Sequence, residues 1–456
     1  MNMGALAPKT ELQPAGRRLL LISYDFPPRR TSAVYRVTNL TKHLVRYGWQ
    51  PTVLTVQGSR GDPEDPLLLE GFPPQIRVER TRSLEISGWE GIAGVGVRAL
   101  GGLRPLEEDR QQPPWDRWIR AAGRFVRSCL YFPDDTVGWV PLGLAKAIEL
   151  HLQSRFDAVY TTSPPRAGPV IGLLLKSLLG VPWAAEFRDP WYPPSKPWRR
   201  TLERRLLQRV LDRADRIIVI SEGNANDFDQ SYGIPRCKVA VVSNGYDEND
   251  FAALDGKRSP LLEERYLHLS HFGTVYPNFS GQFFDALLDL VTECPDLRNH
   301  LRVNIIGFPD DAVQHYAARS DLRDLIRLNG FVKHQEAIAA MASSDCLLLF
   351  LGSRDVARLS GLGKIYDYLR VGRPILAVAY EGGAQKLIEE GKAGWVVDPE
   401  DREGIKAALR AIVQRGKRTE NPHPARPQFV EQFRFDRVAG KLAAVLDSMV
   451  SCGRQA

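Results

Sequence analysis

Short apolar runs alternate with longer amphipathic stretches along most of this 456-residue chain. Each apolar run ends in a polar or Gly/Pro-rich loop, and a helical pattern follows it, so the repeated order is strand, loop, helix. Parallel strands that are separated by helices form βαβ units around a buried sheet. The pattern therefore predicts an α/β fold, and it occurs twice, in residues 17–245 and in residues 263–425.

The predicted strands are short and mostly apolar. In the first half they include Leu19–Tyr24, Thr52–Val56 and Pro182–Phe187, and a helix is expected over Ala33–Tyr47. In the second half, strands are expected at 266–272, 301–306, 345–350, 373–378 and 394–397. A last helix is expected over Asp436–Val450.

The remaining segments interrupt the alternation. We expect residues 1–16 to be a disordered tail, 58–115 an irregular Gly- and Pro-rich insertion, and 246–262 a linker between domains. Residues 426–456 are expected to form a helical segment that returns towards the N-terminal domain. Since a single core stops growing near roughly 250–300 residues, the length also favours two domains.

The composition is that of an ordinary globular protein, with 43% hydrophobic and 25% charged residues, which excludes disordered and fibrous classes. The five cysteines are isolated, and this favours a reducing compartment over disulfides or structural zinc. We see no apolar leader and no transmembrane helix in the sequence, so a cytoplasmic location is expected.

The net charge is +7, and nearly all of the excess lies in residues 1–250. Two amphipathic helices carry much of it, Trp115–Phe132 and Lys196–Arg213. The first places one stripe of basic side chains on its surface: Arg117, Arg120, Arg124 and Arg127. Such helices suit an anionic membrane surface, although a solvated face is the more frequent use of one such helix alone. We expect no nucleic-acid partner, because no recognition module is visible.

A charged pair, Arg188 and Asp189, comes directly after the predicted strand Pro182–Phe187. In open α/β sheets, ligands bind outside the carboxyl ends of the strands. The pair is therefore a candidate for catalysis, with Asp189 able to handle a proton.

A second candidate precedes the predicted helix Ile365–Val371. Glycines at a helix start expose backbone N–H groups, and the helix dipole favours an anion there. A diphosphate cradle would then use Ser360, Gly361, Gly363 and Lys364, with Asp367 for sugar or ribose hydroxyls. The alternative is a plain helix cap with a surface pair between Lys364 and Asp367.

Three other patterns give weaker evidence for a functional site. Gly273 and Thr274 follow a predicted strand, where Gly273 would permit close approach of a ligand or form an ordinary turn. Gly94–Ala99 matches GxGxxA without the flanking strands that a dinucleotide site needs, so we discount it. The Asp-rich spots at 134–135, 247–250 and 310–311 are interpreted as turn chemistry, so no metal site is expected.

A series of strings along the chain is specific in its order and spacing. The series reads YDFPP, GWQPTVLT, FDAVYTTSPP, PWAAEFRDPW, ADRIIVIS, VVSNGYD, GFVKHQEAIAAMASSDCLLL, GKIYDYLRVGRPILA and GWVVDP. It resembles the retaining family 4 glycosyltransferases with a GT-B fold, and most closely members that act in bacterial polysaccharide biosynthesis. The resemblance covers about residues 17–450.

The resemblance implies two Rossmann-like parallel-sheet domains facing a central cleft. It also implies metal-independent transfer with retention, with no cofactor apart from the nucleotide diphosphate sugar as substrate. The donor would bind mainly to the second domain, at the residues above and Arg354. The acceptor would lie on the first domain, near Pro27, Tyr35, Arg36 and Ser163.

The chain departs from the family pattern at three places. Arg29–Arg30–Thr31–Ser32 replaces the glycine pair of the first loop. The family's two glutamates, eight positions apart, correspond to Leu359 and Asp367. The Arg and Lys that commonly hold the diphosphate are missing after the first strand of the second domain, so Lys364, Arg354 or Arg358 would substitute.

These observations predict a glycosyltransferase of the hexosyltransferase type at the inner face of the cell membrane. It would move a sugar from a nucleotide sugar to a lipid-linked or saccharide acceptor. A nucleotide-sugar epimerase or hydrolase of the same fold is one alternative. A non-catalytic scaffold for polysaccharide assembly is another.

Overall fold

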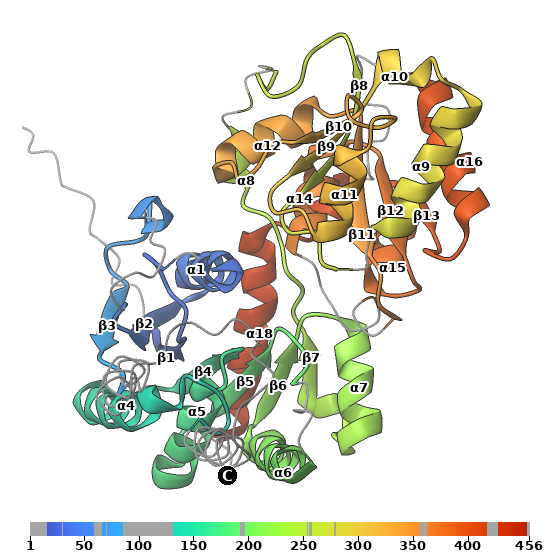
Figure 1. Ribbon diagram of the computed structural model, residues 1–456. Coiled ribbons are helices and arrows are strands. Elements are labelled where there is room, and N and C mark those ends of the chain that lie inside the picture. The colour runs from blue at the N-terminus through green and yellow to red at the C-terminus, as the bar shows by residue number, and fades with distance from the viewer. Residues whose placement is uncertain are drawn as a thin grey trace, which may run out of the picture. The chain divides into compact units, whose positions relative to one another are not determined.

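The computed structural model describes residues 16–29, 31–58, 66–69, 71–84, 131–191, 197–252, 254, 258–277, 280–354, 357, 363–416 and 427–453. Two parallel sheets organise these residues (Figure 1). The expectation of an α/β fold with two Rossmann-like parallel-sheet domains is confirmed.

The first sheet has seven strands in the order β3-β2-β1-β4-β5-β6-β7. The strands are β1 (Arg17–Ile22), β2 (Trp49–Val56), β3 (Arg77–Thr81), β4 (Ala158–Ser163), β5 (Trp183–Phe187), β6 (Arg216–Val219) and β7 (Val239–Val241). Its helices are α1 (Ser32–Leu44), α4 (Val140–Ser154), α5 (Ala167–Leu179), α6 (Pro197–Arg213) and α7 (Glu222–Tyr232). Short 3-10 turns occur at Val45–Tyr47, Pro66–Leu69, Val137–Trp139 and Arg236–Lys238.

The central strands of this sheet are apolar on both faces. Leu19, Leu20, Leu21 and Ile22 of β1 are all 0% exposed. Helices cover both sides in Figure 1, with α1 on one side and α4 and α5 on the other. A parallel sheet that is covered on both faces needs continuous apolar strands. For this reason the apolar runs in the sequence predicted the sheet.

The expectation of an irregular insertion over 58–115 is wrong for one part of it. Arg77–Thr81 forms β3, which pairs in parallel with β2 at the edge of the sheet. Its sequence, RVERT, is mostly polar, and none of its residues is fully buried. An edge strand needs little apolar character, so the hydrophobic pattern gave no signal. Residues 59–65, 70 and 85–115 lie outside the described residues.

The second sheet has six strands in the order β10-β9-β8-β11-β12-β13. They are β8 (Leu267–Phe272), β9 (Leu301–Ile306), β10 (Ile326–Leu328), β11 (Cys346–Leu351), β12 (Ile375–Ala379) and β13 (Gly394–Val397). Five were predicted within about two residues. Strand β10 was missed, since it has only three residues and its last two are exposed at the sheet edge.

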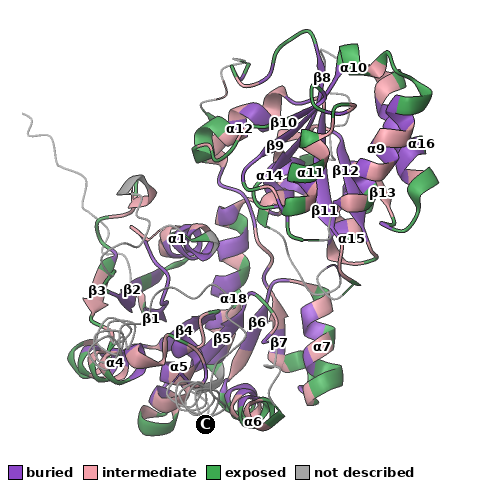
Figure 2. Ribbon diagram, viewed as in Figure 1, coloured by how far each residue is buried: buried purple, intermediate pink, exposed green. Residues whose placement is uncertain are grey.

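Side chains of β11 alternate between two apolar layers. Cys346, Leu348 and Phe350 pack with one core cluster, and Leu347 and Leu349 pack with the other. Helices α9 (Gly281–Glu293), α11 (Asp311–Ala318) and α16 (Arg402–Arg415) supply the first layer. Helices α8 (Glu248–Ala252), α12 (His334–Ser343), α14 (Gly363–Val371), α15 (Gly383–Gly391) and α17 (Pro427–Glu431) supply the second. Figure 2 shows the inner strands of this sheet, β8, β9, β11 and β12, buried between them.

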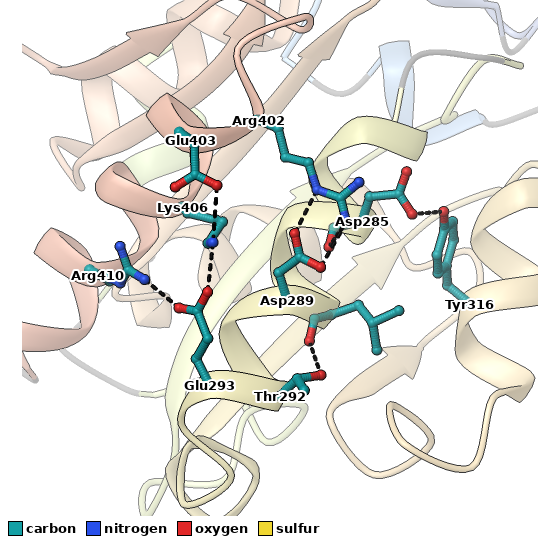
Figure 3. Close-up of polar contacts among 10 residues, drawn as sticks. Asp285, Asp289, Thr292, Glu293, Tyr316, Arg402, Glu403, Lys406 and Arg410 are labelled. Carbon is teal, nitrogen blue, oxygen red and sulfur yellow. Dashed lines mark hydrogen bonds and ion pairs between the residues drawn. The ribbon is translucent and has the colours of Figure 1, made fainter.

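Helices α9 and α16 are also joined by a ladder of ion pairs (Figure 3). Arg402 donates two hydrogen bonds to Asp289, at 2.6 and 2.7 Å. Lys406 donates to Glu293 at 2.7 Å, and Arg410 pairs with the same carboxylate. Because most of these groups are partly solvated, the ladder orients the two helices more than it stabilises them.

Two further helices complete the described chain, α10 (Leu297–His300) and α18 (Phe435–Gly453). Near the end of α18, Asp447 accepts a hydrogen bond from the Trp49 indole at 2.9 Å and pairs with Arg17 at 2.7 Å. Within the described part of the chain, no helix combines the length and the apolar character that crossing a membrane requires.

Candidate functional site

Two glycine turns meet at the carboxyl ends of β8 and β9. Gly273 follows β8 with a φ of 91°, and Gly307 follows β9 with a φ of 141°. A Cβ built on Gly307 would lie 2.3 Å from the Gly273 carbonyl oxygen. Both conformations favour glycine, so the loops can pack closely only with this residue type. The sequence suggested that a ligand could approach Gly273 closely. In this structure the close approach is made by the backbone of Gly307.

Lys364 reaches this turn from the first turn of α14. Its ammonium donates to the Phe272 carbonyl oxygen at 2.7 Å, and it lies 3.3 Å from the place that a Cβ on Gly273 would occupy. Burial lowers the pKa of Lys364 to about 8. The motifs around Gly273 and Lys364, which are far apart in the sequence, are therefore brought together. A Cβ on Gly363 would meet nothing within 4 Å, so space does not require that glycine.

His271 and Tyr368 tie the same helix to the sheet. The Nε2 atom of His271 lies 3.4 Å from the Lys364 ammonium, and its Nδ1 lies 3.1 Å from the Leu348 carbonyl oxygen. The Tyr368 hydroxyl donates to that carbonyl at 3.2 Å and accepts from the Phe272 N–H at 3.1 Å. The start of α14 is thus held by hydrogen bonds to two neighbouring strands.

Asp367 lies one turn after Lys364 and is 8% exposed. Its Oδ1 atom is buried and makes no hydrogen bond. Burial raises the pKa of Asp367 to about 7; the charge of His334 opposes this rise and that of Asp250 adds to it. The surface Lys364–Asp367 ion pair, the alternative considered from the sequence, is not formed. A buried carboxylate oxygen without a partner is costly, and a ligand hydroxyl would satisfy it.

The charged groups that act on Asp367 come from α8 and α12. The His334 Nε2 atom lies 3.1 Å from Asp250 Oδ2. Burial lowers the pKa of His334, but the hydrogen bond to Asp250 and the charges of Asp250, Asp367 and Asp247 outweigh it, so the net change is a rise. An imidazolium here would partly balance the acidic side chains around it.

Two exposed phenylalanines stack on each other beyond the ends of β9 and β10. Phe308 is 57% and Phe331 is 52% exposed, with their ring centroids 6.2 Å apart and the rings inclined by 27°. Each follows a glycine with positive φ, Gly307 or Gly330. The sequence signal for this pair of rings is a Gly–Phe dipeptide that follows a strand twice.

Other predicted donor residues are placed less favourably. Arg354 pairs with Glu400 at 3.2 Å and covers the Tyr380 ring at 4.3 Å. Thr274 is exposed in the turn after β8. Arg358, Leu359, Ser360 and Gly361 lie outside the described residues, so the predicted diphosphate cradle is described only from Gly363 onwards.

The predicted acceptor-side residues follow strand ends of the first sheet. Pro27 lies in the loop after β1 and accepts a hydrogen bond from Arg80. Ser163 is the last residue of β4, which pairs in parallel with β1, so these two positions lie at the same edge of the sheet. Tyr35 and the buried Arg36 lie in α1, which the loop after β1 precedes.

Arg188 and Asp189 come directly after β5, as predicted. Arg188 is 9% exposed, whereas Asp189 is exposed. Surrounding protein raises the pKa of Asp189, and the charge of Arg188 partly offsets this. Such a carboxyl group can exchange a proton closer to neutral pH than an isolated aspartate.

The Asp side chains of the predicted turns accept hydrogen bonds from nearby backbone N–H groups. Asp134 accepts from the Thr136 N–H at 3.0 Å, and Asp310 caps α11 by accepting from the Val313 N–H at 2.9 Å. Asp247 accepts from the Asn249 N–H at 3.0 Å. No group of three or more His, Cys, Asp or Glu side chains that could hold a metal ion occurs in the ranges that the structure describes.

The four arginines predicted to contact a membrane, Arg117, Arg120, Arg124 and Arg127, lie outside the described residues. The second basic helix is described as α6. Its buried Glu203 accepts from Arg199 at 2.8 Å, while Arg205, Arg209 and Arg213 are exposed. These three arginines follow one stripe of the helix.

Two family models match most of the chain. The model described as "Glycosyl transferase 4-like domain" matches residues 32–245, and "Glycosyl transferases group 1" matches residues 275–415. The chain belongs to the family 4 glycosyltransferases of the GT-B fold. The resemblance to glycosyltransferases of the GT-B fold is thereby confirmed.

Curated relatives of this family match at low identity. D-inositol 3-phosphate glycosyltransferase of Streptomyces avermitilis is 24% identical over 260 residues, which is 54% of this chain and 54% of the relative. The enzyme of the same name from Corynebacterium urealyticum is 20% identical over 256 residues, covering 53% and 58%. The chain thus spans about half the length of the curated relatives it matches.

Solved structures share the fold over nearly the whole chain. HepE of Anabaena in complex with UDP has a TM-score of 0.61 at 17% identity, and covers 94% of this chain and 100% of its own. A glycosyltransferase of Rickettsia africae has a TM-score of 0.64 at 14% identity, covering 96% and 99%. At such identities these structures show the shared GT-B fold alone.

Proposed function

We propose that this protein transfers a sugar from a nucleotide diphosphate sugar to a lipid-linked or saccharide acceptor, with retention at the anomeric carbon. The observation that carries the proposal is the pair of groups on α14. An ammonium, Lys364, is held at the Gly273 turn, and a buried carboxylate oxygen without a partner, on Asp367, follows one turn later. A diphosphate next to sugar or ribose hydroxyls has the matching chemistry.

The leaving diphosphate gains negative charge as the glycosidic bond loosens, and a fixed cation stabilises that charge. The Lys364 ammonium makes two contacts with protein atoms, with the Phe272 carbonyl oxygen and with His271 Nε2. Its third N–H is left for the diphosphate. Without an evident nucleophile, the leaving phosphate itself would accept the proton of the acceptor hydroxyl on the same face of the sugar.

Asp367 would accept a hydrogen bond from a ribose or sugar hydroxyl at its buried Oδ1 atom. The stacked pair Phe308–Phe331 would provide an aromatic face for the nucleobase. Stacking on aromatic side chains is sequence-tolerant, because every base has a π-face. The solved HepE structure contains UDP, which supports a nucleoside diphosphate as the ligand of this fold.

The acceptor would use the first-sheet residues Pro27, Tyr35, Arg36 and Ser163. Arg188 would orient it, and Asp189 would assist proton transfer. Since the curated relatives are named for an inositol 3-phosphate acceptor, a phosphorylated polyol is one further acceptor to include in tests. A role in cell-surface polysaccharide assembly at the cytoplasmic face of the membrane belongs to the same proposal.

The test is release of nucleoside diphosphate from a panel of nucleotide sugars, with and without a lipid extract. We expect release that depends on acceptor, survives EDTA and falls in a Lys364→Met variant. Release without acceptor at an undiminished rate would instead favour a hydrolase. Absence of binding to every nucleotide sugar tested would favour the non-catalytic scaffold. The leucine at position 359, where the family has a glutamate, already favours that alternative.

A further inference from the structure

His271 is a polar residue on a face of the central strand β8 that is otherwise apolar. It is 1% exposed, and it lies on the same face as Leu267 and Leu269. Its ring stacks on Phe350, with centroids 5.0 Å apart and an interplanar angle of 20°. An aliphatic residue would fill this space at no polar cost. The imidazole is therefore explained by what its nitrogen atoms contact.

The contacts of the ring define the form of the imidazole. The Leu348 carbonyl oxygen can only accept a hydrogen bond, so Nδ1, at 3.1 Å from it, carries the proton. Burial and the charge of Lys364 hold the pKa of His271 well below its ordinary value, against hydrogen bonds to the backbone at Leu348 and Thr274. The ring is therefore neutral, and the lone pair of Nε2 faces the Lys364 ammonium at 3.4 Å.

Lys364 is consequently held from two directions. The Phe272 carbonyl oxygen accepts one of its N–H groups at 2.7 Å, and His271 accepts a second. The Gly273 turn leaves room for the ammonium, since a Cβ there would lie only 3.3 Å from it. A flexible lysine side chain with two fixed acceptors loses most of its rotational freedom before a ligand arrives.

We propose that His271 is a positioning residue, which holds the Lys364 ammonium so that its remaining N–H points to the donor diphosphate. This inference rests on the function proposed above for Lys364. His271 itself does not touch the substrate. Its role is to fix a cation that would otherwise be free to turn toward solvent, so its removal should weaken binding only as long as Lys364 is present.

Two substitutions separate the roles of the ring nitrogens. In His271→Asn, the amide can still donate to Leu348 but no longer reaches Lys364. In His271→Gln, the longer amide presents an oxygen acceptor near the place of Nε2. We expect about two- to tenfold weaker binding in the Asn variant, the cost of ordering one flexible side chain when the ligand binds, and recovery of most of the affinity in the Gln variant.

The decisive measurement is a double-mutant cycle with Lys364→Met, using calorimetry. The probe is UDP, or GDP, ADP or dTDP if the wild type does not bind UDP. We expect His271→Asn to weaken nucleotide binding in the wild-type background. In the Lys364→Met background it should weaken binding no further. Thermal unfolding of every variant checks that the folded protein is compared.

The possible outcomes distinguish this inference from the function on which it rests. An equal loss from His271→Asn in both backgrounds would overturn the positioning role and leave a purely structural one. Unchanged affinity in Lys364→Met alone would overturn the diphosphate role of Lys364, whatever His271 does. Failure of the Gln variant to recover affinity in a folded protein would also contradict the proposal.

Discussion

Lys364 and Asp367 lie one turn apart on α14, and burial moves the pKa values of their side chains toward each other, to about 8 for Lys364 and about 7 for Asp367. Their ordinary values lie more than six units apart, about 10.4 and 3.9. The narrow interval that results has a consequence for binding. The ammonium is charged below about 8, and the carboxylate is charged above about 7, so both charged forms coexist only near neutral pH.

We therefore expect the kcat/KM of sugar transfer to rise with pH through about 7 and to fall through about 8. The acid limb reports Asp367, which accepts a ligand hydroxyl better as a carboxylate, and the alkaline limb reports loss of the Lys364 charge. A Lys364→Arg variant should lose the alkaline limb, because arginine stays protonated. A His334→Gln variant is the control for the acid limb, because His334 is a second titratable group whose charge acts on Asp367. A profile that stays flat from about pH 6 to about pH 9 would contradict the assignment.

The same raised pKa predicts a stability effect. Since the pKa of Asp367 in the folded protein, about 7, exceeds the unfolded value, the folded state binds more protons between about pH 4 and about pH 7. Stability is therefore lost as the pH rises through this window, by about 2–4 kcal/mol for a shift of this size.

The substitution Asp367→Asn removes the titration and keeps the shape of the side chain. It should raise the unfolding midpoint relative to wild type at about pH 8 and leave it nearly unchanged at about pH 4, while donor affinity falls. Thermal unfolding at both pH values is the measurement. Asp321→Asn is the control of opposite sign, because Asp321 is a half-buried carboxylate that pairs with Arg319, and this pairing lowers its pKa. Destabilisation by Asp367→Asn at about pH 8 would show that the carboxylate has a partner in solution.

The sequence predicted the sheets well because their strands are buried on both faces. Runs such as Leu19–Ile22 and Cys346–Leu351 leave a signal that needs no knowledge of the partner strands. The edge strands β3 and β10 lack that signal, since an edge strand packs less of its surface. Pairing across the sheet defines them, and pairing is not written in local hydrophobicity.

The site was predictable in position but not in detail. The repeated order of strand, loop and helix indicated Gly273 and the start of α14 as site positions. The structure brings the two together. The sequence could not show that Lys364 turns inward to the Phe272 carbonyl, because that carbonyl is backbone and its direction depends on the Gly273 turn. Nor could it show that Asp367 is buried without a partner, which depends on α12 and α14 packing together.

The stacked pair Phe308–Phe331 predicts a loss of nucleotide affinity on truncation. Exposed aromatic rings present apolar surface to water in the free protein. A base that stacks on them removes part of this surface from water, which favours binding. Phe308→Leu and Phe331→Leu should each weaken binding of the nucleoside diphosphate by about 1–3 kcal/mol, with little effect on inorganic pyrophosphate. Calorimetry with both probes separates base from phosphate contacts.

The matched control for the aromatic pair is Tyr276→Leu. Tyr276 is another exposed aromatic residue, 59% exposed in the loop after β8. Equal losses from all three substitutions would indicate a general effect of surface aromatics. Unchanged affinity in both phenylalanine variants would show that the base lies elsewhere on the second sheet.

The last prediction concerns the membrane surface. Arg205, Arg209 and Arg213 are exposed along one stripe of α6, and within the described ranges they make no ion pair. Each basic residue near an anionic surface contributes about 1 kcal/mol, so the three together should give binding that salt weakens. We expect the protein to sediment with anionic liposomes and not with neutral ones, and the triple substitution to Gln to reduce this binding about tenfold or more.

The control for the α6 stripe has the same change in net charge. Arg323, Arg327 and Lys386 are exposed residues of the second-sheet half, and their triple substitution to Gln should leave liposome binding nearly unchanged. Equal losses in the two variants would indicate that net charge alone drives the association. Full binding by the α6 variant would leave Arg117, Arg120, Arg124 and Arg127 as the candidates for the same assay. Binding of RNA at the same salt concentration, with no binding to liposomes, would show that the stripe meets a different polyanion.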